Sequence, residues 1–338
     1  MNISPVKGWV YQPVPGFESH LLQELTESGI APQPLGSLYR SEIPPASPRP
    51  AASAHGSGFV PQHTAFWYQN CWLEPFRAEF TSISEAASIL RAIQRNWASA
   101  LFTQYRRGAL IAKKLPPVSV KRRPFPWKAP ESPMGAWTLL DAHTLLASAR
   151  CVSPFPNGTI EFEEDTIHPP SRAYLKLWEA FALTGSMPCK NERCLDAGAS
   201  PGGWTWALAA LGAMVTAVDR APIDDTLLAL PNVTFLKHDA FTLRPEDIGG
   251  IDWLCCDVIC YPPRLYEWIE KWLSSGLCGN FVCTIKMQGD PDFETTRRFA
   301  ALPGSRMVHL YHNKHELTWL YTSSNRANWT PEFRTGAQ

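Results

Sequence analysis

The chain has 338 residues, 45% of them hydrophobic, and its 31 basic and 31 acidic residues give a net charge of zero. This length can bury more than one core, so a globular protein of two or three units is expected. The opening residues, MNISPVKGWVYQP, lack the basic and apolar regions of a secretory signal, and the longest apolar run, Trp206 to Val218, is too short to span a bilayer. These features exclude a membrane protein and predict a soluble, cytoplasmic one.

Nine cysteines are scattered without a Cys-x-x-Cys pair, and several lie in apolar strand-like runs. This usage predicts reduced, buried thiols and neither disulfides nor zinc. His309, His312 and His315 have a metal-like spacing, but they straddle a predicted strand end and point in different directions, so no metal site is expected. No heptad or exposed apolar stripe demands a dimer, and a monomer is favoured.

The first 80 residues predict a small α+β domain. The run GWVYQPVPGFESHLLQELTESG indicates a strand, a turn at Pro15-Gly16 and an amphipathic helix. Residues 41–58 are rich in Pro, Ala and Ser and cannot bury a core, which predicts a loop or linker within this domain.

Residues 81–165 predict a second, basic region, with a helix capped by Ser84 and strand-like residues around 137–151. Between residues 91 and 130 there are ten basic residues and no Asp or Glu. Within this stretch RRPFPWK interleaves cations with Phe125 and Trp127, a composition suited to phosphate contact and base stacking, although a solvated basic face with buried aromatics is the alternative. The candidate RNA-binding residues are Arg106, Arg107, Lys113, Lys114, Lys121, Arg122, Arg123 and Lys128.

Residues 166–338 predict a catalytic α/β domain, because helical and strand-like patterns alternate regularly from Ser171 onward. The predicted helices are Tyr174–Leu183, Trp204–Leu211 and Leu265–Leu273; the predicted strands are Arg193–Ala199, Met214–Asp219, Val233–Lys237, Ile251–Val258, Asn280–Met287, Arg306–Tyr311 and Leu317–Tyr321, the last two as an antiparallel pair. Sites in doubly wound sheets lie at the carboxyl ends of parallel strands, where Asp219, Asp239, Asp257 and Lys286 stand.

Residues 194–219, CLDAGASPGGWTWALAALGAMVTAVD, predict a strand, a Gly-rich loop, a helix and a second strand that ends in Asp219. Glycines at this turn let a ligand approach the backbone closely, and an acid at the second strand tip can accept hydrogen bonds from ribose hydroxyls. The loop reads G-A-S-P-G-G and lacks the G-x-G-x-x-G spacing that seats a dinucleotide pyrophosphate. S-adenosylmethionine is therefore the predicted cofactor, with a plain tight turn as the alternative.

Two lysines and two acids carry the predicted chemistry: Lys176, Asp257, Lys286 and Glu316, in SRAYLK, CDV, TIKM and HELT. Lys286 follows an apolar run, where an unpaired ammonium is costly, so it needs an acid partner or a lowered pKa, and Asp257 supplies a partner. With DAGASPGGWT, these motifs resemble the Lys-Asp-Lys-Glu tetrad of FtsJ-like ribose 2′-O-methyltransferases over most of residues 171–323. PPSRAYLKLWEAF, DAGASPGGWTWAL and YHNKHELT most resemble the bacterial 23S rRNA cytidine 2′-O-methyltransferases of the RlmM family.

The resemblance implies a Rossmann-like class I S-adenosylmethionine-dependent methyltransferase domain with a seven-stranded, mostly parallel sheet. It also implies a preceding ferredoxin-like unit, whose family opening matches residues 15–18 (PGFE), and a THUMP-like RNA-binding region. Residues 100–150 are short and Pro-rich for a complete THUMP domain, so a reduced form is expected. The implied partner is large-subunit rRNA, without a membrane or a metal.

The resemblance also implies roles for single residues. Lys286 is the general base, its pKa lowered by Lys176 and partial burial, while Asp257 orients it and opposes that shift. Glu316 holds Lys176 or the ribose. The implied cofactor-binding residues are Asp196, Gly198, Ser200, Pro201, Gly202, Gly203, Trp204, Asp219, Asp239 and Asp257, among which Asp239 could instead cap a helix and Asp196 is ambiguous.

Two other functions remain open. One is a catalytically silent RNA-binding module, against which the intact set of two lysines and two acids argues. The other is an RNA base N-methyltransferase, whose Asn/Asp-Pro-Pro-aromatic motif is only loosely matched by Cys260-Tyr261-Pro262-Pro263. These prolines are expected to form a turn before the helix that follows them.

Overall fold

The computed structural model describes residues 3–27, 29, 31–46 and 64–322, which divide into two compact units. Unit 1 takes the described residues up to Arg122 together with Pro130–Glu161, and unit 2 takes Arg123–Ala129 together with the described residues from Phe162 onward. Most of the loop predicted at 41–58 lies outside the described residues. Among the described helices, none combines the length and apolar character that crossing a membrane requires.

Unit 1 contains an antiparallel sheet that confirms the α+β pattern of the opening residues. Its order is β3-β4-β2-β5, formed by β2 (Trp9–Pro13), β3 (Gln33–Leu35), β4 (Leu38–Ser41) and β5 (Tyr68–Trp72). Helix α1 (Glu18–Thr26) follows the predicted turn and buries Leu21 and Leu25. The buried carboxylate of Glu24 accepts hydrogen bonds from the backbone N–H groups of Phe66 and Trp67, which joins this helix to the segment before β5.

A second, five-stranded sheet in unit 1 has the order β1-β6-β9-β8-β7. Its strands are β1 (Ile3–Pro5), β6 (Phe76–Glu79), β7 (Trp97–Ser99), β8 (Gly135–Leu139) and β9 (Thr144–Ser148), and its core includes residues of α2 (Ile83–Ile93) and α3 (Tyr105–Ala112). The prediction that Ser84 caps α2 is wrong. Ser82 is the cap, since its hydroxyl accepts a hydrogen bond from the Glu85 N–H at 3.1 Å, as a Ser-x-x-Glu pattern favours.

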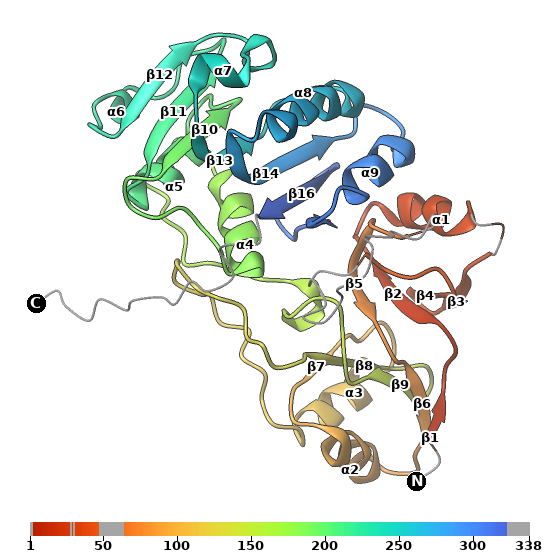
Figure 1. Ribbon diagram of the computed structural model, residues 1–338. Coiled ribbons are helices and arrows are strands. Elements are labelled where there is room, and N and C mark those ends of the chain that lie inside the picture. The colour runs from red at the N-terminus through yellow and green to blue at the C-terminus, as the bar shows by residue number, and fades with distance from the viewer. Residues whose placement is uncertain (1–2, 28, 30, 47–63, 323–338) are drawn as a thin grey trace, which may run out of the picture. The chain divides into compact units, whose positions relative to one another are not determined.

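Unit 2 is built on a sheet of order β12-β11-β10-β13-β14-β16-β15 (Figure 1). Its strands are β10 (Arg193–Ala197), β11 (Met214–Asp219), β12 (Val233–Lys237), β13 (Ile251–Cys256), β14 (Cys278–Lys286), β15 (Ser305–Val308) and β16 (Glu316–Thr322). Strands β12, β11, β10, β13 and β14 are parallel to one another, whereas β16 runs antiparallel to both β14 and β15. The predicted α/β alternation and the antiparallel final pair are confirmed.

The strand order of unit 2 reverses between β10 and β13, because the chain steps outward through β11 and β12 and then in the opposite direction through β14. Right-handed crossovers in two directions place the connecting helices on opposite faces of the sheet. Accordingly α5 (Gly203–Ala210) contacts β10, β11 and α4 (Tyr174–Thr184), whereas α8 (Pro262–Ser275) contacts β14, α7 (Pro245–Ile248) and α9 (Phe293–Ala300). A short helix, α6 (Asp225–Leu228), precedes β12.

The prediction that the double proline forms a turn before α8 is wrong. Pro262 and Pro263 open the helix itself, with Tyr261 as its N-cap residue. Proline fits this first turn because its missing N–H would have no partner inside the helix and its fixed φ is already helical.

A segment from the basic stretch, Arg123–Ala129, belongs to unit 2. The ring of Phe125 stacks on that of Trp178 in α4, with centroids 4.5 Å apart and planes at 6°, and the Ala129 N–H donates to the Ala182 carbonyl at 3.1 Å. One face of the Phe125 ring is therefore covered by a tryptophan, which favours the alternative of buried aromatic residues at this position. Arg123 lies over the Trp127 ring, 5.1 Å from its centroid.

Candidate active site

Four elements of unit 2 bring the predicted tetrad together at the carboxyl edge of the parallel strands. Lys176 lies in the first turn of α4, and Asp257 follows β13 directly. Lys286 ends β14 and Glu316 begins β16, and the antiparallel register places these two residues opposite each other. The parallel sheet and its one antiparallel neighbour therefore suffice to gather three of the four side chains, and α4 adds the fourth.

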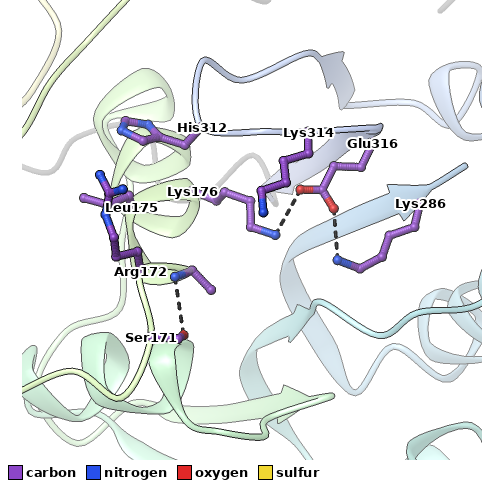
Figure 2. A pocket seen from close by; sticks show the side chains of 9 residues that line it. Ser171, Arg172, Leu175, Lys176, Lys286, His312, Lys314 and Glu316 are labelled. Atoms are coloured by element: carbon purple, nitrogen blue, oxygen red, sulfur yellow. Dashed lines mark hydrogen bonds and ion pairs between the residues drawn. The ribbon is translucent and has the colours of Figure 1, made fainter.

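The tetrad forms a closed ring in which each lysine contacts both acids. Lys176 Nζ lies 2.8 and 2.9 Å from the two carboxylate oxygens of Asp257 and 3.0 Å from Glu316 Oε1. Lys286 Nζ lies 2.7 Å from Asp257 Oδ1 and 2.9 Å from Glu316 Oε2. Figure 2 shows the contacts of both lysines with Glu316. Charges alternate around the ring, so each buried charge has two opposite neighbours.

Thr284, which was not among the predicted site residues, also contacts the tetrad. Its hydroxyl donates to Asp257 Oδ1 at 2.6 Å, and its side chain is fully buried. Residues two apart on a strand share a face, so the TIK spelling, with Thr284 two residues before Lys286, was the available signal.

Burial and the neighbouring charges shift the pKa values of Asp257 and Lys286 within the tetrad. Burial raises the pKa of Asp257, but the charges and hydrogen bonds of Lys176 and Lys286 outweigh burial, and the pKa lies below its ordinary value. Burial favours the neutral form of Lys286, yet Asp257 and Glu316 together hold its pKa well above the ordinary lysine value. The prediction of a lowered Lys286 pKa is wrong for the protein by itself, because burial lowers the pKa but the charges and hydrogen bonds of two carboxylates outweigh it.

A cavity of about 510 Å³ opens beside the ring. It is lined by Ser171, Arg172, Ala173, Leu175, Lys176, Lys286, His312, Lys314 and Glu316 (Figure 2). Four of these nine residues are lysine or arginine and one is an acid, so the cavity suits an anionic or hydroxyl-bearing substrate.

The predicted Gly-rich loop lies beside the tetrad, between β10 and α5. Gly198 has φ of +82°, and a Cβ atom there would come within 2.6 Å of Val258 Cγ2 and 3.0 Å of the Val258 backbone. Gly202 has φ of +121°, and a Cβ atom there would come within 2.2 Å of Leu227. Both positions require glycine, for backbone conformation and for close packing.

The loop is held to the tip of β11. Asp219 accepts hydrogen bonds from the backbone N–H groups of Ser200, at 3.0 Å, and Ala221, at 2.9 Å. The Ser200 hydroxyl donates to the Pro222 carbonyl at 2.9 Å. The structure thus brings together the predicted cofactor residues Gly198, Ser200 and Asp219.

Two other predicted cofactor residues are buried. Asp196 is fully buried in β10, and burial raises its pKa to about 7. One carboxylate oxygen accepts from the Thr205 hydroxyl at 2.6 Å, and the other has no hydrogen-bond partner among the described residues. Trp204 donates its indole N–H to the Ala173 carbonyl at 2.9 Å, and its ring centroid lies 6.0 Å from Lys176 Nζ.

Asp239 caps the short turn Ala240–Thr242 by accepting from the Phe241 N–H at 3.0 Å, and it also pairs with Arg264 at 3.4 Å. The histidines have separate partners: His312 contacts Glu179, and His309 contacts the Lys314 carbonyl. Within the described residues, no group of His, Cys, Asp and Glu has the arrangement of a metal site.

The predicted RNA-binding residues are divided between the units. Arg106 and Arg107 lie in α3, with Lys113 and Lys114 following it, and Lys121 and Arg122 also belong to unit 1; Arg123 and Lys128 belong to unit 2. The Arg107 guanidinium lies over the Phe80 ring, and Arg122 pairs with Glu161 at 3.3 Å.

The model of the FtsJ-like methyltransferase family matches residues 169–300. The ribosomal RNA large subunit methyltransferase M of Azoarcus sp. is 33% identical over 185 residues, which is 50% of each chain. That of Alkalilimnicola ehrlichii is 37% identical over 191 residues, 52% of this chain and 51% of the relative. The chain thus spans about half the length of several curated relatives that it matches.

A longer match extends beyond unit 2. The ribosomal RNA large subunit methyltransferase M of Xanthomonas oryzae pv. oryzae is 30% identical over 255 residues, which cover 70% of this chain and 69% of the relative. Among solved structures, TrmN from Thermus thermophilus covers 93% of this chain and 99% of its own, with 14% identity and a TM-score of 0.32, a likeness too low to bear on function. The family match and the long alignment carry the assignment: the chain belongs to the FtsJ-like ribosomal RNA large subunit methyltransferase M family.

Proposed function

We propose that this protein transfers a methyl group from S-adenosylmethionine to a ribose 2′-hydroxyl of RNA, and that its substrate is a cytidine in 23S rRNA. The observation that carries the proposal is the closed ring of Lys176, Asp257, Lys286 and Glu316 next to a Gly-rich loop at the point where strand order reverses. FtsJ-like rRNA methyltransferases use S-adenosylmethionine as their methyl donor, and the relatives are named for large-subunit rRNA.

The residues of the loop fit this donor. Gly198 and Gly202 keep the loop in a conformation with positive φ, Asp219 stands at the tip of the second strand, where ribose hydroxyls can donate to it, and one oxygen of Asp196 lacks a hydrogen-bond partner among the described residues. When bound, the donor supplies an electrophilic methyl group on a sulfonium centre. Gly198, Ser200, Pro201, Gly202, Gly203 and Trp204 would hold its methionine end, with Asp196 beneath them, Asp257 beside them, Asp219 at the ribose and Asp239 at the adenine.

A ribose 2′-hydroxyl is a poor nucleophile, and the tetrad supplies the acid–base chemistry that activates it. Lys286 is the proposed proton acceptor, which requires its neutral amine, and the raised pKa means that the free protein offers this form rarely at pH 7. Asp257, held by Thr284, fixes the position of Lys286 Nζ. Glu316 joins both lysines and so keeps the ring closed at the cavity.

The domain assignments are also proposals. Unit 2 supports a Rossmann-like class I methyltransferase domain over residues 166–338, because strand order reverses at the Gly-rich loop and the last pair is antiparallel. The two sheets of unit 1 support a ferredoxin-like domain over 1–80 and a reduced, basic THUMP-like domain over 81–165 for RNA. The segment Arg123–Ala129 departs from this division, because it lies within the sequence range 81–165 but packs within unit 2.

The test is transfer of labelled methyl from S-adenosylmethionine to unmodified, protein-free large-subunit rRNA, followed by alkaline hydrolysis, which leaves 2′-O-methylated linkages intact. We expect an alkali-resistant labelled dinucleotide that begins with cytidine. Lys286→Ala should reduce its formation at least about a hundredfold while cofactor affinity stays within about threefold.

The matched control is Lys271→Ala, which removes an exposed lysine of α8 outside the tetrad. It should retain activity. Label recovered in mononucleotides would instead establish base methylation, and cofactor binding without any labelled RNA would favour a silent binding module. Full activity in Lys286→Ala would overturn the assignment of the proton acceptor.

A further inference from the structure

The cations that line the cavity differ in whether they have a partner. Lys176 and Lys286 share the two acids of the ring, and Arg172 pairs with Glu164 through two hydrogen bonds of 2.7 and 2.8 Å. Lys314 also lines the cavity and is exposed, but within the part of the chain that the structure describes its ammonium has no ion pair or hydrogen bond. The two lysines and two acids of the ring are neutral together, and Glu164 balances the charge of Arg172. Lys314 is therefore the lysine of the cavity whose charge has no acidic partner among the described residues.

The backbone that carries Lys314 is held on both sides. The Glu179 carboxylate, on the same helix as Lys176 and 2% exposed, accepts hydrogen bonds from the backbone N–H groups of Tyr311 and His312 at 2.8 and 3.0 Å. The His312 ring also contacts it, with 2.6 Å between Nδ1 and Oε2. A buried acid three residues from Lys176 thus joins the segment before β16 to α4.

Further bonds fix the residues on either side of Lys314. Asn313 and Thr318 exchange side-chain hydrogen bonds of 3.0 and 3.1 Å, and the His315 carbonyl accepts from the Met287 N–H at 3.1 Å. The Lys314 carbonyl itself contacts His309 Nε2 at 3.1 Å. These bonds hold the backbone of the segment on both sides of Lys314, and Figure 2 shows the Lys314 side chain beside Lys176 and Glu316.

We propose that Lys314 binds the phosphodiester group next to the target ribose and so positions the 2′-hydroxyl at the tetrad. This inference rests on the proposed function. The negative group nearest to a 2′-hydroxyl in an RNA strand is the phosphate on the neighbouring 3′-oxygen. A ribose seated at Lys286 and Glu316 would bring that phosphate into the same cavity, where Lys314 is the lysine with its charge uncompensated. Lysine acts on phosphate as a point charge on a flexible stem, which suits a contact that positions the RNA strand without reading its bases.

The experiment compares Lys314→Gln, Lys314→Arg and the unchanged protein in methyl transfer to the same protein-free rRNA, over a series of KCl concentrations. We expect Lys314→Gln to raise KM for RNA about tenfold at low salt, because a charge-assisted contact is lost, and to leave the dissociation constant for S-adenosylmethionine unchanged. The slope of log KM against log salt should fall by about 0.7, the value for one phosphate contact on a single strand. Lys314→Arg should restore both quantities.

The control is Lys271→Gln, which removes one positive charge from an exposed lysine of α8 and should change neither KM nor the slope. Equal slopes in Lys314→Gln and the unchanged protein would overturn the phosphate contact, as would failure of arginine to restore binding. These outcomes are separate from failure of the proposed function, since that would appear as absence of alkali-resistant label with the unchanged protein.

Discussion

At the residue scale, the tetrad shows how four charges can share one buried site. Asp257 has a lowered pKa, so the stabilisation from its ion pairs is present above the ordinary aspartate pKa and is lost as pH falls through the lowered value. Lys286 has a raised pKa, so its contribution is present below the ordinary lysine pKa and is lost only as pH rises through the raised value. Asp257 is therefore ionised, and Lys286 protonated, throughout the neutral range.

This charge state predicts a pH dependence of catalysis. If Lys286 accepts the proton, the neutral amine is a minor species in the free protein, and its share rises tenfold with each pH unit. We expect kcat/KM for RNA to rise with a slope of about one from pH 6.5 to pH 9, without a plateau, in single-turnover assays. The affinity for S-adenosylmethionine, measured at each pH, serves as the control and should stay constant within about threefold. A flat profile above pH 7 would transfer the role of proton acceptor to a carboxylate of the ring.

At the scale of elements, the connection from β10 to α5 is the part of the site that depends most on backbone geometry. Gly198 occupies a left-handed conformation against the backbone of Val258, which follows Asp257 of the tetrad. A side chain there would therefore push apart the proposed cofactor loop and the tetrad. This contact joins the loop to the residue that follows Asp257.

We predict that Gly198→Ala weakens S-adenosylmethionine binding at least about tenfold, because a strained left-handed residue costs roughly 1–3 kcal/mol and the new Cβ has no space. Titration calorimetry with S-adenosylmethionine is the measurement. Gly212→Ala is a matched control: its φ of +83° is similar, but its Cβ would meet only Lys190, and it follows the far end of α5. Similar affinities in the two variants would show that the close approach at Gly198 is not needed for binding.

The elements also show what sequence patterns could predict. The strands Met214–Asp219 and Val233–Lys237 were predicted with their observed bounds, because apolar runs that end in an acid or a turn signal buried parallel strands. The tetrad could be placed because three of its members end or begin strands. The role of Glu179 could not be predicted, because it lies within an almost wholly buried helix and only tertiary structure shows that its carboxylate binds a segment more than a hundred residues later.

At the scale of the whole molecule, the division into two compact units does not follow the order of the sequence. The basic segment Arg123–Ala129 precedes 32 residues of unit 1, Pro130–Glu161, yet packs within unit 2. A pattern of charges and aromatic residues in the sequence cannot distinguish rings that pack on a neighbouring helix from exposed rings that can stack on a nucleobase. The structure assigns Phe125 to the first kind, since it stacks on Trp178 two residues after Lys176 in α4.

This packing predicts that Phe125→Ala destabilises unit 2 by about 2 kcal/mol, because a half-buried ring and its stacking partner are both lost. Urea unfolding of the full chain, followed by tryptophan fluorescence, measures the change, and Val120→Ala, at a side chain 78% exposed, is the nearby control. KM for RNA should stay within about threefold in the folded variant. Unchanged stability together with a large increase in KM would return Phe125 to the role of a base-stacking residue. The predicted result would mean that the segment stabilises the helix that carries Lys176, and that its contribution to the reaction passes through α4 and not through contact with a base.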